Sequence, residues 1–91
     1  MSAPQAVMFG TDAQLRKRAL GLTWPSHGPR RRAPNFWGDL EVRGFLAATH
    51  RQMTLDEARA AIAERFGAAR VPSRSAVNRF WLVLDQQGAA A

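Results

Sequence analysis

The sequence predicts an all-α fold: a small helical domain with a helix-turn-helix, three to four helices in all, and a basic, proline-rich N-terminal arm. Apolar residues recur at helical spacing in several segments, and few segments alternate as half-buried strands do. Residues suited to cap a helix stand immediately ahead of these segments. The chain of 91 residues is long enough for one small core. We expect a basic arm with one short helix at residues 1–38 and the helix-turn-helix domain at residues 39–91.

The two helices at the centre of this prediction lie between residues 53 and 85. Thr54 and Glu57 have the spacing of a capping box, in which each side chain bonds a free backbone N–H. An apolar stripe follows, made of Leu55, Ala58, Ile62 and Phe66. Gly67 is expected to end this helix as a left-handed residue. After a short turn, Ser73 is expected to cap a second helix with the stripe Val77, Phe80, Trp81 and Leu84. This order is typical of a DNA-binding helix-turn-helix.

The outer face of the second helix carries residue types that read base edges. At about 100° per residue, Ser75, Asn78 and Arg79 fall opposite the apolar stripe or at its edge, and Arg74 flanks them in the first turn. Arginine bonds guanine and asparagine bonds adenine in bidentate fashion, and serine is adaptable. We therefore expect these four residues to contact bases, with two further contacts to phosphates from Arg70 and Thr54. The alternative is an ordinary solvated helix face.

The segment from Val71 to Phe80 resembles the opening of the second helix in the N-terminal helix-turn-helix of small terminase subunits of Mu-like phages. The matching residues are Ser73, Arg74, Ser75, Ala76, Arg79 and Phe80. Related strings open the second helix of other helix-turn-helix proteins of phages and transposons. The resemblance covers about a third of the chain. It implies binding of phage DNA at the start of packaging, with a large terminase subunit or another phage protein as partner, and more generally a regulatory protein of a phage or mobile element.

The distribution of charge favours a nucleic-acid partner. The net charge is +6. Residues 1–38 hold six basic and one acidic side chain, or +5, whereas residues 39–91 hold seven and six, or +1. Twelve of the thirteen basic residues are arginine, whose planar fork suits phosphate and a narrow minor groove. Double-stranded DNA is therefore the expected partner.

Residues 23–35 are too rich in proline to form regular structure. Three consecutive arginines lie within them, Arg30, Arg31 and Arg32. They resemble the basic arms that enter a minor groove beside a helix-turn-helix, and we expect them to make a second, electrostatic DNA contact. The alternative is a solvated basic loop. Trp24, Phe36 and Trp37 are expected to pin this segment to the helices, with base stacking as the other possibility.

Two more helices complete the prediction. Thr11 and Gln14 predict a capped helix at about residues 12–20, and Asp39 predicts a cap for a helix from Leu40 to about Arg51. Gly44 inside the latter is tolerable if another helix packs closely there.

The apolar run from Phe80 to Leu84 must be covered on more than one side, by the N-terminal helix or by a second subunit. A homo-oligomer is therefore expected. A β-strand over residues 79–84 is the structural alternative.

The sequence lacks the residue patterns that are typical of a catalytic site. The two histidines, His27 and His50, have no ligand spacing, and no phosphate loop or paired carboxylates occur. We expect no enzyme activity, cofactor or metal. No apolar run spans a bilayer and no signal peptide is evident, so no membrane partner and a cytoplasmic location are expected. The leading hypothesis is sequence-preferring binding of double-stranded DNA. The rival is a small interaction module, an adaptor or inhibitor, that binds an acidic partner protein.

Overall fold

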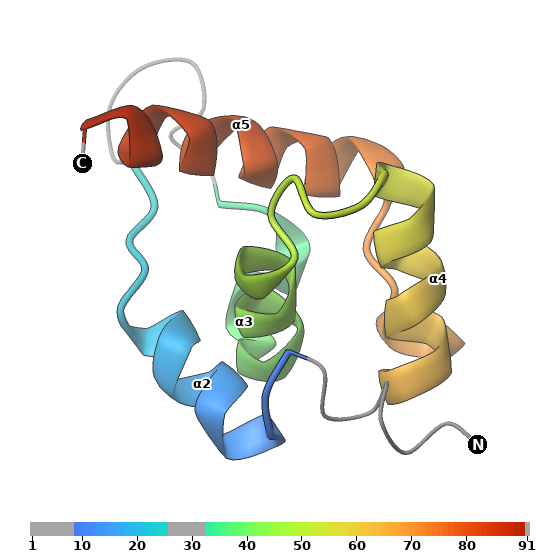
Figure 1. The fold of residues 1–91 in the computed structure, drawn as a ribbon. Coiled ribbons are helices and arrows are strands. Elements are labelled where there is room, and N and C mark those ends of the chain that lie inside the picture. Colours follow the sequence, from blue (N-terminus) through green and yellow to red (C-terminus); the bar gives the residue numbers. More distant parts are fainter. Residues whose placement is uncertain (1–8, 26–32, 91) are drawn as a thin grey trace.

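A computed structural model describes residues 9–25 and 33–90, with side chains up to residue 87. Within these ranges the chain is all-helical, as predicted, and no residue lies in a strand. The elements are α2 (Asp12–Leu20), the 3₁₀ turn η1 (Asn35–Gly38), α3 (Leu40–Ala48), α4 (Leu55–Phe66), the 3₁₀ turn η2 (Ala68–Arg70) and α5 (Arg74–Ala90) (Figure 1). The strand alternative for residues 79–84 is wrong, because these residues lie within α5.

The helices begin where the capping residues stand in the sequence. Thr11 and Thr54 each form a complete capping box, with Gln14 and Glu57 as the reciprocal partners. The Ser73 hydroxyl accepts a hydrogen bond from the backbone N–H of residue 76 at 3.1 Å and so caps α5. These short-range bonds satisfy N–H groups that have no partner inside the helix. The predicted bounds of α2 and α4 are therefore confirmed.

Helix α3 is shorter than expected and ends at Ala48 rather than near Arg51. The Thr49 hydroxyl donates to the carbonyl of Phe45 at 3.0 Å, which occupies a carbonyl at the helix end. A turn follows in which Arg51 adopts a φ of 60°. A left-handed residue cannot continue a right-handed helix, so the chain leaves the helical path before α4.

The segment between α4 and α5 covers residues 67–73 and is bounded by Gly67 and Ser73, as predicted. It runs back along α4, so that α5 starts beside the N-terminal end of α4 (Figure 1). Two contacts hold this path: Arg59 Nε donates to the Pro72 carbonyl at 3.0 Å, and Arg74 Nε lies 3.3 Å from Asp56 Oδ1. Gly67 has φ 104° and ψ 148°, an extended conformation with positive φ rather than the left-handed helical one. A non-glycine residue would be strained there.

The core is centred on α5. Val77, Phe80, Trp81 and Val83 are all at least 98% buried. The ring of Phe80 lies 5.4 Å from that of Phe36 and 5.7 Å from that of Trp37, and Trp24 stacks on it at 6.4 Å between centroids. These three aromatic residues anchor their segments to the helices, as predicted. The cover over Phe80 thus comes from η1 and the Trp24 segment, whereas α2 packs chiefly on α3.

The contact between α2 and α3 depends on Gly44, as the sequence suggested. A Cβ atom at this position would lie 2.0 Å from the backbone carbonyl oxygen of Leu15. The neighbouring Arg43 is 7% exposed and donates to the carbonyls of Ala19 and Trp37 at 2.9 and 2.8 Å. Burial lowers the pKa of Arg43. Helix α2 is therefore joined to the rest of the core both by close backbone approach and by a buried guanidinium group.

Candidate nucleic-acid interface

The N-terminal half of α5 has one buried and one solvent-facing side. Arg74, Ser75 and Asn78 are exposed, whereas Val77 and Phe80 are buried. The predicted separation of polar and apolar faces is therefore present in the structure. Because the apolar face is fixed in the core, the three exposed side chains project from a rigid element.

Arg74 has an acidic neighbour on α4. Its Nε atom lies 3.3 Å from Asp56 Oδ1, and the two side chains are 65% and 72% exposed. An ion pair this exposed contributes about 0–1 kcal/mol. A phosphate or a base edge could therefore replace Asp56 as the partner of Arg74 at little cost.

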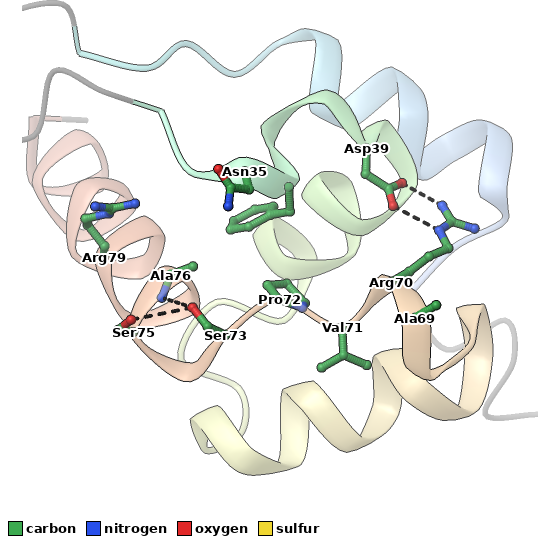
Figure 2. Close-up of a pocket in the computed structure, with 11 residues that line it drawn as sticks. Asn35, Asp39, Ala69, Arg70, Val71, Pro72, Ser73, Ser75, Ala76 and Arg79 are labelled. Atoms are coloured by element: carbon green, nitrogen blue, oxygen red, sulfur yellow. Dashed lines mark hydrogen bonds and ion pairs between the residues drawn. The ribbon is translucent and has the colours of Figure 1, made fainter.

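Arg79 is placed differently from the three exposed residues. It is half-buried and lines a groove of about 520 Å³ between α5, η1 and the segment before α5. Figure 2 shows Arg79 and Asn35 at one end of this groove and the paired side chains of Asp39 and Arg70 at the other. The Nε atom of Arg79 is buried and has no hydrogen-bond partner among the residues that the structure describes. The groove and the role of Asn35 in it were not found from the sequence, because no local pattern marks them.

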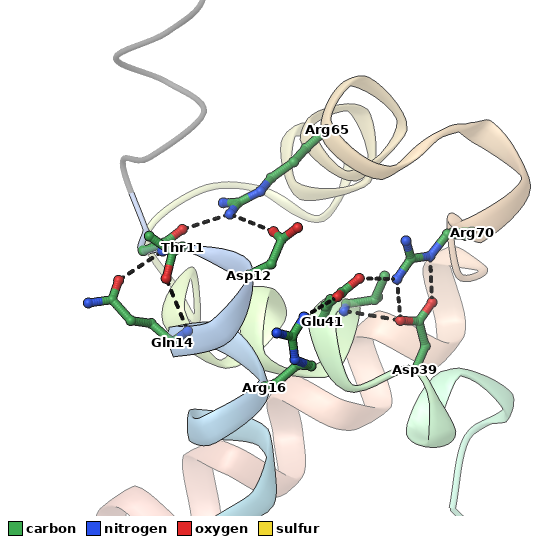
Figure 3. A network of polar contacts seen from close by, with 10 residues as sticks. Thr11, Asp12, Gln14, Arg16, Asp39, Glu41, Arg65 and Arg70 are labelled. Carbon is green, nitrogen blue, oxygen red and sulfur yellow. Dashed lines mark hydrogen bonds and ion pairs between the residues drawn. The ribbon is translucent and has the colours of Figure 1, made fainter.

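Arg70, predicted to contact phosphate, is occupied by two carboxylates. It donates to Asp39 through Nε at 2.9 Å and Nη2 at 2.6 Å, and to Glu41 at 2.9 Å (Figure 3). Glu41 also accepts from Arg16 at 2.6 Å. The hydrogen bonds from Arg70 are the largest cause that lowers the pKa of both Asp39 and Glu41, and they raise the pKa of Arg70. Arg70 would have to leave this network before it could bind a phosphate.

The remaining predicted site residues divide into two groups. Thr54 is exposed, but its hydroxyl accepts the N–H of Glu57 in the capping box of α4. Arg30, Arg31 and Arg32 lie outside the described residues, as does His27. The structure therefore places Arg74, Ser75, Asn78 and Arg79 on α5. Thr54 lies at the N-terminus of α4, which is close to the start of α5.

His50 has a contact that ties α5 to the turn after α3. Its Nε2 atom lies 2.6 Å from Asp85 Oδ1 and 3.1 Å from the Trp81 carbonyl oxygen. Arg51 also pairs with Asp85.

Within the described residues no group of three or more histidine, cysteine or acidic side chains has the arrangement of a metal site. Likewise, none of the helices in this part of the chain is both long and apolar enough to cross a membrane.

The Arg70 network leads to a pH-dependent expectation. Replacing Arg70 with glutamine should lower the free energy of unfolding at pH 7 by about 1–2 kcal/mol, the value of charged hydrogen bonds after allowance for exposure. Folded-state pKa values of Asp39 and Glu41 lie below their ordinary 3.8 and 4.5, so their stabilisation is present above those values and is lost as the pH falls through the lowered ones.

Urea denaturation of the parent and the Arg70→Gln variant at about pH 7 and about pH 3 measures this difference. The difference in the free energy of unfolding between the two proteins should narrow at the lower pH, because the unfolded parent binds protons at Asp39 and Glu41 below 3.8 and 4.5, whereas the folded parent binds them only at lower pH. Lys17→Gln removes an exposed cation of α2 and is the matched control. If the free energies of unfolding of the parent and Arg70→Gln differed by the same amount at both pH values, the pKa shifts could not be assigned to Arg70.

The class of protein that these observations define is a small all-helical domain with a polar, arginine-bearing face on its last helix. Comparison of the chain with protein-family models, with curated proteins and with solved structures gives no match.

Proposed function

We propose that this protein binds double-stranded DNA with a sequence preference, through the outer face of the N-terminal half of α5. The observation that carries the proposal is the shared exposure of Arg74, Ser75 and Asn78 on one side of a helix whose other side is buried. These residue types bond base edges in the major groove. A recognition helix uses its first turns for this purpose, and all three residues lie there.

The balance of charge supports a polyanionic partner. The net charge is +6. Most acidic side chains of the described residues are engaged by arginine, namely Asp12, Asp39, Glu41, Asp56 and Asp85. Attraction to DNA would therefore meet little opposition from unpaired carboxylates. In this proposal Arg30, Arg31 and Arg32 add an electrostatic contact that does not depend on base sequence.

The biological setting proposed is the regulation or packaging of phage or mobile-element DNA. It rests on the resemblance of residues 71–80 to the opening of the second helix in small terminase subunits. A homo-oligomer and a large terminase subunit are the partners that this setting would add. Purification beside a large terminase subunit and measurement of the assembled mass would test that part separately from DNA binding.

Asn78 offers the most direct test of base recognition. A preferred site is first selected from a random duplex library, and the affinity of the Asn78→Ala variant is then measured on the selected and on random duplexes. The variant should lose about 1–3 kcal/mol on the selected site and show relaxed preference at one position. Binding to random duplex should change little, because no phosphate contact is removed.

Gln86→Ala supplies the matched control, since Gln86 is an exposed amide further along the same helix. It should leave both affinities unchanged. If Asn78→Ala binds the selected and random duplexes as the parent does, α5 is not the reading element. If the parent binds no duplex even at low salt, the proposal of DNA binding is wrong, and an acidic partner protein becomes the hypothesis to pursue.

A further inference from the structure

The groove beside α5 contains an arginine that pairs with no acidic side chain in the part of the chain that the structure describes. Among the described residues, Arg79 makes no ion pair or hydrogen bond, and its Nε atom is sealed from solvent. Two other arginines also have a buried nitrogen without a partner, but both are otherwise engaged. Arg43 donates to two carbonyls, and Arg65 donates to the Gly10 carbonyl and to Asp12. Arg79 lines the groove and has no acidic partner among the described residues, so an anion in the groove would supply the counter-charge that its guanidinium group lacks.

Other groups that line the groove are suited to the same kind of ligand. The Ser73 oxygen accepts the N–H of Ala76 and lies 3.5 Å from the Ser75 oxygen, where either hydroxyl can be the donor. When Ser75 donates, the Ser73 O–H can rotate to donate into the groove. Asn35 is exposed at the end occupied by Arg79 and brings an amide NH₂ group (Figure 2). Guanidinium, hydroxyl and amide donors are the side-chain groups that contact phosphate oxygens in nucleic-acid complexes.

The charge of the groove favours an anion at the Arg79 end. Asp39 is the acidic residue among those that line it, and Arg70 holds both of its carboxylate oxygens at the opposite end. The pair of Asp39 and Arg70 is neutral, so Arg79 leaves the groove with one positive charge. The apolar floor, which includes Phe36, lowers the competition from water for this charge.

We propose that this groove binds one phosphate group, with Arg79 as the cationic ligand and Ser73 and Asn35 as additional donors. The inference rests on the proposed function in one respect, because a backbone phosphate of duplex DNA is the source that the position of the groove favours. Arg79 flanks the exposed face of Arg74, Ser75 and Asn78, and backbone phosphates flank the bases that a recognition helix reads. Arg79 is thus a phosphate ligand that sets the position of α5, and base reading is left to the three exposed residues.

The experiment compares the Arg79→Gln variant with the parent on random and selected duplexes at about 50 mM and about 200 mM salt. Loss of one phosphate contact should weaken binding to all duplexes by the same factor and leave the preferred sequence unchanged. The slope of log affinity against log salt should fall by about 0.9, so the advantage of the parent should shrink roughly 3.5-fold between the two salt concentrations. Arg18→Gln, which removes an exposed arginine on α2, is the matched control.

A second arm uses inorganic phosphate and follows backbone amide chemical shifts by NMR. Phosphate should shift the amides of residues 35, 36 and 73–79 in the parent and in Arg79→Lys, but not in Arg79→Gln. The parent could show saturable shifts with phosphate and yet bind no duplex. This result would support the phosphate site, with a free phosphate ester as its ligand, and would refute only the proposed DNA binding. Two outcomes would overturn the phosphate site and leave DNA binding intact. In the first, the parent binds duplex DNA and Arg79→Gln weakens that binding no more than Arg18→Gln does. In the second, Arg79→Gln changes only the sequence preference.

Discussion

Replacing Gly44 with alanine should lower the free energy of unfolding by about 2–3 kcal/mol, the upper range for added volume in a packed core. The new methyl group would lie 2.0 Å from the carbonyl oxygen of Leu15, which belongs to the backbone of α2 and cannot rotate away. Helices α2 and α3 would have to move apart. The greater helix propensity of alanine, roughly 1 kcal/mol, is too small to offset this.

Thermal and urea denaturation followed by circular dichroism measure this effect. Gly38→Ala is the matched control, because among the described residues nothing lies within 4 Å of a Cβ atom built there. That variant should stay within about 0.5 kcal/mol of the parent. A Gly44→Ala variant as stable as Gly38→Ala would show that α2 does not pack on α3 as described.

Replacing Trp81 with alanine should have the largest effect of all, a loss of about 3–5 kcal/mol. Trp81 is 1% exposed, and its indole N–H donates to the carbonyl of Leu46 at 3.0 Å. That carbonyl lies in the last turn of α3, where backbone oxygens have no partner within the helix. The variant would leave a cavity and would reduce the partners of the Leu46 carbonyl to the Thr49 hydroxyl, which lies 3.4 Å away. A small domain has about 5–15 kcal/mol in total, so a large share of its stability would be lost.

The Trp81→Phe variant separates the two contributions. It keeps most of the ring volume and removes the hydrogen bond, so we expect a loss of about 1–3 kcal/mol. Leu82→Ala on the same helix is the control for α5 itself, since Leu82 is half-buried and lies outside the central cluster. Urea denaturation of the three variants should rank Trp81→Ala as the least stable. A Trp81→Ala variant no less stable than Leu82→Ala would contradict the position of Trp81 in the core.

Sequence by itself determined the helices and the residues that begin them. Thr11, Asp39, Thr54 and Ser73 all cap the helices that they were predicted to cap. Each cap is a bond between residues three apart, and each apolar stripe follows from the helical repeat, so both are written locally in the chain. Gly44 also allowed a prediction from the sequence. A glycine inside a helix costs stability, which is tolerable where another helix packs closely against it.

Only the tertiary structure decided which charged residues of the candidate site are free. Arg70 meets Asp39 and Glu41 across separations of 31 and 29 residues, whereas Arg79 meets no acid among the described residues. The seven-residue path from Gly67 to Ser73 and the aromatic cover over Phe80 are decided in the same way. The physical reason is that an ion pair or a groove depends on how packed elements approach one another in space, and spacing along the chain carries no record of that approach.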